Sequence, residues 1–304
     1  MPRPTYAEYC RQIFGHRMQK LTINAGFSCP NRDGALATTG CSFCNNAAFN
    51  PAYCQPDKSI TQQIDEGIAF HQRRRRHKGG YLAYFQAYSN THAPLSVLQQ
   101  RYAEALEHPM IDGLVIGTRP DCVDDAKLDY IATLAQQHYV MVEYGIESCY
   151  DATLRRVNRG HDYACTVQAV QATARRGIAC GGHLILGLPG ESCDDILAEA
   201  DMLSQLPLTT LKLHQLQILY GSQMADDYLR NPASVPPPFT LDEYVDLVRQ
   251  FLSRLRSDII VERYVSEVPS RFQADPSRAW HHADGTAVKA EEVARLIANI
   301  EVYN

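Results

Sequence analysis

The sequence lacks any long uncharged apolar run. No stretch of about 18 consecutive apolar residues occurs in its 304 residues, so no membrane-spanning helix is predicted. The first twenty residues also lack the apolar core of a secretory signal peptide. The formal net charge is only −5, which argues against binding nucleic acid through overall charge alone. These absences predict a cytoplasmic protein.

Cysteine, by contrast, is abundant. The ten cysteines are too scattered for a small secreted disulfide framework, and most are expected to be buried thiols. Cys29, Cys41 and Cys44 differ from the rest, because they share one loop rich in Gly, Asn, Thr and Pro. Their spacing, C-x11-C-x2-C, brings three thiolates close enough for one soft-metal site.

The pattern of apolar residues predicts the fold that carries this loop. From about residue 20 to residue 219, short apolar runs alternate with longer amphipathic ones, which is a βα rhythm. Six units of roughly 33 residues suit a partial (βα)6 barrel, because a full eight-unit barrel needs about 250 residues. The predicted strands are 20–25, 81–86, 114–118, 140–145, 179–187 and 211–219, and the predicted helices are 6–14, 59–74, 94–108, 124–138, 163–177 and 192–206.

The pattern changes after residue 220. A Pro-rich connection over 231–239 precedes a predicted helix over 240–255, a segment at 259–265 that suits an extra strand, and a terminal helix. The sequence thus predicts an α/β, partial (βα)6 TIM-like barrel with a C-terminal helical and strand extension. The core with its N-terminal helix is expected over 1–220 and the extension over 221–304, packed together as one structural unit.

The cysteine loop follows the first predicted strand, at the barrel end where catalytic groups usually gather. Three thiolates suit an iron–sulfur cluster with one open iron, because a complete set for four irons is four cysteines. Cys54 leaves a second interpretation open, since a fourth thiolate would complete a closed tetrahedral zinc site. The spacing alone allows both.

Together with the cysteine loop, several motifs resemble those of the radical S-adenosylmethionine superfamily, and within it the small bacterial family of YhcC and YtqA type, which is related to the elongator catalytic subunit. The resemblance covers about residues 18–271, although the first cysteine interval here is eleven residues rather than the common three. The motifs are YFQAYSNT (84–91), GTRPD (117–121), EYGIES (143–148), VNRGH (157–161), HLILGLPGE (183–191) and KLHQL (212–216).

The resemblance implies a partial barrel that holds a [4Fe–4S] cluster on Cys29, Cys41 and Cys44. It implies that the open iron chelates S-adenosylmethionine, that an electron donor such as flavodoxin or ferredoxin reduces the cluster, and that reductive cleavage yields a 5′-deoxyadenosyl radical. Residues matching the family's cofactor contacts are Gln86, Ala87, Glu147, Ser148, Arg159, Ile185 and Gly187.

Polar residues on otherwise apolar strands indicate a substrate pocket in the lumen. Glu143, His183 and His214 are the candidate catalytic residues, which could bind substrate or move a proton. A buried Glu143 needs a cationic partner, because an unpaired buried charge costs about 3–5 kcal/mol.

The sequence leaves the substrate open. Similarity to proteins of YtqA type implies a tRNA substrate, modified at the carboxymethylaminomethyl side chain of a wobble uridine. A second hypothesis is a radical SAM enzyme that acts on a small metabolite or a protein. A third is a zinc-stabilised binding module without redox chemistry. The basic run Arg73 to His77 ends a predicted helix on the face opposite the active site, so it gives RNA binding little support. Lys58, beside the cysteine loop, is better placed to meet an anion.

Overall fold

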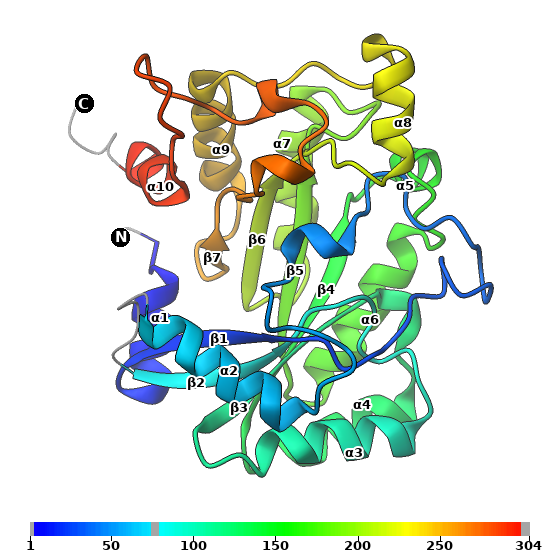
Figure 1. Ribbon diagram of the computed structural model, residues 1–304, viewed down its shortest axis with the longest axis vertical. Coiled ribbons are helices and arrows are strands. Elements are labelled where there is room, and N and C mark those ends of the chain that lie inside the picture. Colours follow the sequence, from blue (N-terminus) through cyan, green and yellow to red (C-terminus); the bar gives the residue numbers. More distant parts are fainter. Residues whose placement is uncertain (1–2, 74–78, 299–304) are drawn as a thin grey trace.

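A curled parallel sheet organises the molecule. The computed structural model describes residues 3–73 and 79–298, and within them seven strands form one sheet in sequence order, each parallel to the next. Figure 1 shows the first and last strands at the two edges of this curled sheet. The partial barrel is therefore confirmed, and the segment at 259–265 supplies its seventh strand. The strands are β1 (Arg17–Ile23), β2 (Gly79–Phe85), β3 (Ile111–Thr118), β4 (Tyr139–Glu147), β5 (Ala179–Leu186), β6 (Thr210–Gln215) and β7 (Ile260–Arg263).

The helices agree closely with the sequence pattern. Each helix predicted with bounds lies within a few residues of its expected range, and two short helices, α5 and α8, were not predicted. Capping boxes fix three of the starts among the described helices, at Thr5 for α1, at Ser192 for α7 and at Thr240 for α9. The helices are α1 (Tyr6–Phe14), α2 (Ile60–Arg73), α3 (Leu95–Leu106), α4 (Asp125–Ala135), α5 (Asp151–Arg156), α6 (Tyr163–Arg175), α7 (Cys193–Ser204), α8 (Gln223–Arg230), α9 (Leu241–Arg254) and α10 (Ala290–Ala298).

The two faces of the sheet are buried against different partners. Side chains alternate along each strand, so Tyr81 and Phe85 of β2 join the core beneath the outer helices, while Leu82 faces the lumen. In the lumen, Leu82 packs in a cluster with Met141 of β4, and Phe14 of α1 lies against that cluster. The N-terminal helix thus closes one end of the lumen, and the carboxyl ends of the strands surround the other.

The open edges of the sheet are linked by charged side chains. Lys20 of β1 forms an ion pair of 2.6 Å with Glu262 of β7. The Arg3 guanidinium donates hydrogen bonds to the carbonyls of Leu255 at 2.7 Å and Ile259 at 2.5 Å, just before β7. Because β7 belongs to the sheet and α9 packs on α7, the C-terminal extension is part of the barrel wall. A division at residue 220 stays a proposal.

No helix within residues 3–73 and 79–298 combines the length and the hydropathy needed to cross a bilayer. Arg73 is the last residue of α2, and the rest of the basic run, residues 74–77, lies outside the described residues.

Candidate functional site

A cavity of about 240 Å³ lies at the carboxyl ends of the strands. Its walls come from the ends of β2 to β7 and from the cysteine loop after β1, since the ends of parallel strands meet at the same edge of a sheet. Most of the predicted site residues line it. They are Cys29, Cys41, Cys44, Gln86, Glu143, Glu147, Arg159, His183, Ile185 and His214.

Three predicted cofactor contacts are set back from this cavity. Ala87 is fully buried. The Ser148 hydroxyl donates to Glu191 Oε1 at 2.5 Å. Gly187 has a φ of +88°, and a Cβ there would lie 2.8 Å from the Phe239 ring, so only glycine fits without a shift. The roles of these three residues stay predictions.

The cysteine loop is tied to the barrel by backbone hydrogen bonds. The N–H of Ser42 donates to the Val157 carbonyl at 2.9 Å, and the Ser42 carbonyl accepts from the Met224 N–H at 2.8 Å. These bonds hold the segment that carries Cys41 and Cys44 against α8 and the loop after α5. All three cavity cysteines, including Cys29, are free thiols.

Two side chains direct N–H groups at Cys41. Arg159 Nη1 and Asn31 Nδ2 each lie 3.6 Å from Cys41 Sγ, and Asn31 also donates to the Arg159 carbonyl at 2.9 Å. A nearby guanidinium and N–H donors stabilise a thiolate, which is the form that binds metal. Burial, opposing this, raises the pKa of the Cys44 thiol.

The donor set fits the expected [4Fe–4S] cluster. Three thiols share one cavity wall, and the donors at Cys41 suit an anionic sulfur. Among the residues that the structure describes, no three His, Cys, Asp or Glu side chains are grouped to hold a single metal ion. Thiolates on a four-iron cluster bind separate irons and need not converge on one point.

Cys54 does not share this environment. Its side chain is 2% exposed, it is absent from the residues that line the cavity, and burial raises its pKa to about 12. A buried thiol of this kind behaves as a small apolar side chain. Lys58, also in this part of the chain, pairs with Glu66 at 2.6 Å rather than reaching the cavity.

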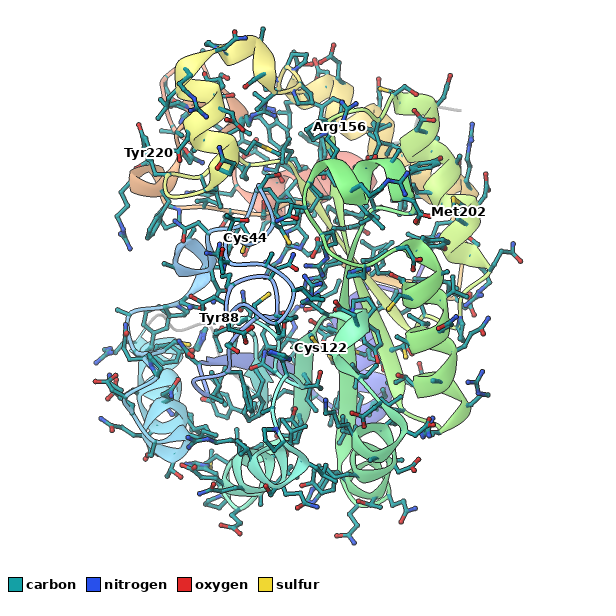
Figure 2. The ribbon with its side chains drawn as sticks, turned by 90° about the vertical axis from the view of Figure 1, so that its right-hand side faces the viewer. Cys44, Tyr88, Cys122, Arg156, Met202 and Tyr220 are labelled. Atoms are coloured by element: carbon teal, nitrogen blue, oxygen red, sulfur yellow. The ribbon has the colours of Figure 1, made fainter. Side chains whose placement is uncertain are left out.

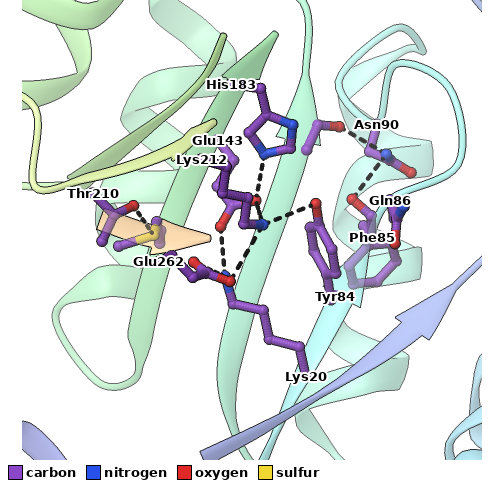
Figure 3. A network of polar contacts seen from close by, with 12 residues as sticks. Lys20, Tyr84, Phe85, Gln86, Asn90, Glu143, His183, Thr210, Lys212 and Glu262 are labelled. Atoms are coloured by element: carbon purple, nitrogen blue, oxygen red, sulfur yellow. Dashed lines mark hydrogen bonds and ion pairs between the residues drawn. The ribbon is translucent and has the colours of Figure 1, made fainter. Parts of the chain in front are cut away.

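A network of buried charges crosses the lumen beneath the cavity (Figure 3). Glu143, which is 1% exposed, accepts from Lys20 and Lys212 at 2.6 Å each, and its Oε2 lies 2.9 Å from His183 Nε2. Glu262 completes the network through Lys20 at 2.6 Å and Lys212 at 3.4 Å. The prediction that Glu143 needs a cationic partner is thus confirmed, because both Lys20 and Lys212 contact it.

The network sets the protonation of its members. Burial alone would raise the pKa of Glu143, but Lys20 and Lys212 outweigh it and hold that pKa well below the usual range. Burial lowers the pKa of His214 well below the usual value, so its imidazole is neutral. The His183 and His214 rings lie 5.6 Å apart, centroid to centroid.

A second charged group surrounds the end of β4. Glu147 has a left-handed φ of 67°, and its Oε1 lies 3.5 Å from Arg159 Nη2. Arg159 also donates to the Gly145 carbonyl at 2.5 Å, and nearby Arg119 pairs with Asp121 at 2.6 Å. Strained backbone in a non-glycine residue such as Glu147 is typical of functional sites.

Sequence reasoning missed several members of the site. Lys20 and Glu262 had a usable signal, because a charged residue inside an apolar strand is rarely buried without a partner. Asn31 and Arg263 had none, since their positions depend on how the loop and β7 pack. The missed residues that take part are Lys20, Asn31, Tyr84, Glu262 and Arg263.

Comparison with known proteins identifies the family. The model of the radical SAM superfamily matches residues 29–203, and that of the Radical_SAM C-terminal domain matches residues 208–291. The uncharacterized protein YtqA of Bacillus subtilis is 35% identical over 269 residues, which cover 88% of this chain and 82% of YtqA. Protein YhcC of Escherichia coli is 43% identical over 213 residues, covering 70% of this chain and 67% of YhcC.

Two archaeal proteins are more distant. A tRNA uridine(34) acetyltransferase of Methanocaldococcus infernus is 22% identical over 183 residues, 58% of this chain and 32% of that protein. The solved structure of Elp3 from the same organism, with residues 1–46 deleted, matches with a TM-score of 0.66 at 14% identity. This match covers 93% of the present chain and 62% of the Elp3 chain, and the likeness shows the fold.

These comparisons decide between the two interpretations of the cysteine loop, an iron–sulfur cluster or a structural zinc site. Membership in an enzyme superfamily rules against a zinc-stabilised binding module without redox chemistry. The chain is an enzyme of the radical SAM superfamily, in the group that includes YtqA and YhcC, and its cofactors are a [4Fe–4S] cluster and S-adenosylmethionine.

Proposed function

We propose that this enzyme modifies tRNA, at the carboxymethylaminomethyl side chain of the wobble uridine. The observation that carries the proposal is the similarity to a tRNA uridine(34) acetyltransferase across 58% of the chain. The Elp3 fold, which the barrel and its C-terminal extension match over 93% of the chain, gives further support. A cytoplasmic location belongs to the same proposal.

The rim of the cavity suits a base taken out of a stacked RNA loop. Tyr88 is 41% exposed at the cavity wall, and Tyr220 is 46% exposed nearby; Figure 2 labels both. Consecutive asparagines connect them, since the Tyr88 N–H donates to Asn46 Oδ1 at 3.5 Å and Asn45 Nδ2 donates to the Tyr220 carbonyl at 2.6 Å. Unstacked bases of single-stranded RNA commonly stack on exposed aromatic rings.

In this proposal, Cys29, Cys41 and Cys44 hold the cluster. With S-adenosylmethionine bound and an electron from a donor such as flavodoxin or ferredoxin, the cluster would supply a 5′-deoxyadenosyl radical, with methionine as the other product, for hydrogen abstraction from the substrate. Arg159 contacts Cys41 and pairs with Glu147, and this pair would meet the carboxylate and ribose hydroxyls of the cofactor.

The lumen residues would orient the substrate and manage its protons. His183 is 22% exposed to the cavity, and Glu143 accepts from it, so its ring orientation is fixed. A carboxylate-oriented imidazole is suited to hold or move a proton at its other nitrogen. His214, which is neutral and lies 5.6 Å from His183 between ring centroids, adds no charge that would repel a protonated amine of the substrate.

An anaerobic assay tests this function. The reconstituted enzyme is incubated with S-adenosylmethionine, reductant and tRNA that bears 5-carboxymethylaminomethyluridine, and both 5′-deoxyadenosine and the modified nucleoside are quantified. We expect 5′-deoxyadenosine to rise as the nucleoside is consumed, and not with tRNA that lacks the modification. Binding should weaken as salt increases, because phosphate contacts release counterions. Negligible affinity for tRNA at low salt would contradict the proposal.

A further inference from the structure

Most cations that line the cavity already face a carboxylate. Such paired groups are oriented by the protein, and the carboxylate offsets their charge. The pairs are Lys212 with Glu143 at 2.6 Å, Arg159 with Glu147 at 3.5 Å and Arg119 with Asp121 at 2.6 Å.

Two arginines of the cavity lining differ from these. Arg32 belongs to the cysteine loop, and its Nη2 donates to the Cys44 carbonyl at 2.7 Å, so its charge faces the thiols. Arg263, at the end of β7, is exposed to the cavity and forms no ion pair within residues 3–73 and 79–298. It is therefore a cation available to a substrate.

A bulge in β7 directs Arg263 to this position. Leu211 of β6 pairs with Val261, but the next residue, Lys212, pairs with Arg263, so Glu262 is an extra residue in the strand. Successive side chains of a regular strand point to opposite faces. The bulge relaxes that alternation, so Glu262 joins the buried network while Arg263 lines the cavity.

The charge of Arg263 is not neutralised by the network beneath it. Lys20 and Lys212 carry two positive charges, and Glu143 and Glu262 carry two negative ones. These four charges balance, so the lumen side of the cavity keeps the unpaired positive charge of Arg263. A compact anion is the ligand that this arrangement favours.

We propose that Arg263 binds the carboxylate of the substrate side chain and so selects a carboxymethylaminomethyl group over an uncharged or amino-terminated one. This inference rests on the function proposed above. A planar guanidinium matches a carboxylate with two parallel hydrogen bonds. A terminal carboxylate can enter a cavity of about 240 Å³ alone, whereas a phosphodiester brings a sugar on each side.

The test compares two RNAs and three variants under anaerobic conditions. Anticodon stem-loops carry 5-carboxymethylaminomethyluridine or its methyl ester, and affinity is measured by fluorescence anisotropy for Arg263→Gln, Arg263→Lys and Arg271→Gln. Arg271 is the matched control, because it is an exposed arginine eight residues further on that is not among the cavity-lining residues. Iron content and circular dichroism verify that each variant is folded and loaded.

We expect Arg263→Gln to weaken binding of the carboxylate RNA about 10- to 100-fold while leaving the ester unchanged. Arg263→Lys should bind the carboxylate RNA more tightly than Arg263→Gln but less tightly than the wild type, because lysine keeps the positive charge and lacks the two parallel N–H donors of a guanidinium. Arg271→Gln should have the same effect on both RNAs. Equal weakening of both RNAs by Arg263→Gln, with a smaller salt dependence, would assign Arg263 to a phosphate and overturn the inference. No change with either RNA would overturn it as well.

The same experiment separates the two proposals. If the wild-type enzyme binds neither RNA and tRNA does not stimulate 5′-deoxyadenosine formation, the proposed function fails and takes the inference with it. If the wild-type enzyme binds and turns over the carboxylate RNA but Arg263→Gln does so equally well, only the inference fails.

Discussion

Replacing Glu143 tests the buried charge network most severely. Glu143→Leu leaves Lys20 and Lys212 to share the single carboxylate of Glu262, and these three side chains are at most 11% exposed. Removing one partner of a buried ion pair typically costs about 3–5 kcal/mol. For a chain of this length we expect the melting temperature to fall by roughly 6–10 °C, at about 2 °C per kcal/mol.

A double variant distinguishes charge imbalance from lost packing. Glu143→Leu combined with Lys212→Met removes one charge of each sign and leaves the Lys20–Glu262 pair of 2.6 Å intact. The double variant should therefore be more stable than Glu143→Leu alone, by about 1–3 kcal/mol. Calorimetry of anaerobically reconstituted proteins with equal iron content measures the stability of the single and the double variant. A Glu143→Leu variant within 1 kcal/mol of the wild type, or a double variant less stable than the single, would refute this reasoning.

Three further predictions concern ionisation and the cluster. The network depresses the pKa of Glu143, so the stability that ionised Glu143 contributes is fully present above about pH 4.5 and is lost as the pH falls toward the folded-state pKa. Thermal melts between pH 3 and pH 7 should therefore show less acid-dependent loss of stability for Glu143→Gln than for the wild type. Burial and Glu191 raise the pKa of Glu199 well above its usual value, so the contribution of Glu199 to stability falls as the pH rises above about 4.5. Glu199→Gln should flatten this dependence of stability on pH. An unchanged dependence would contradict a raised pKa for Glu199. Cys54→Ala should keep the iron and sulfide content of the wild type, whereas Cys44→Ala should lose most of both in a colorimetric assay; equal loss from the two would return Cys54 to the ligand set.

Local patterns were sufficient to predict most of the fold. Apolar runs such as 114–118 and 140–145 are long enough to indicate buried parallel strands, and amphipathic segments such as 240–255 carry capping residues at their starts. Helices α5 and α8 escaped prediction because their six and eight residues are too few to show a helical period.

The site was only partly predictable, because its decisive contacts join distant parts of the chain. Strand parity suggests a lumen position for Glu143, and the place of His183 as a polar residue on an apolar strand suggests the same for it. The Lys20–Glu262 pair spans 242 residues and depends on the two sheet edges approaching each other, which no local pattern reports. The position of Arg263 depends on a one-residue bulge, and a shift of that size reverses which face a side chain occupies.

The most direct test of the account is the formation of 5′-deoxyadenosine. The wild-type protein and Cys41→Ala are reconstituted anaerobically with iron and sulfide, reduced, and incubated with S-adenosylmethionine, and the product is quantified by liquid chromatography and mass spectrometry. Cys41 lines the cavity and is contacted by Arg159 and Asn31, so we predict product from the wild-type protein and none from the variant. Equal product from both proteins, or none from a wild-type protein that carries its full cluster, would contradict the assignment of Cys29, Cys41 and Cys44 as the ligands of a reactive cluster.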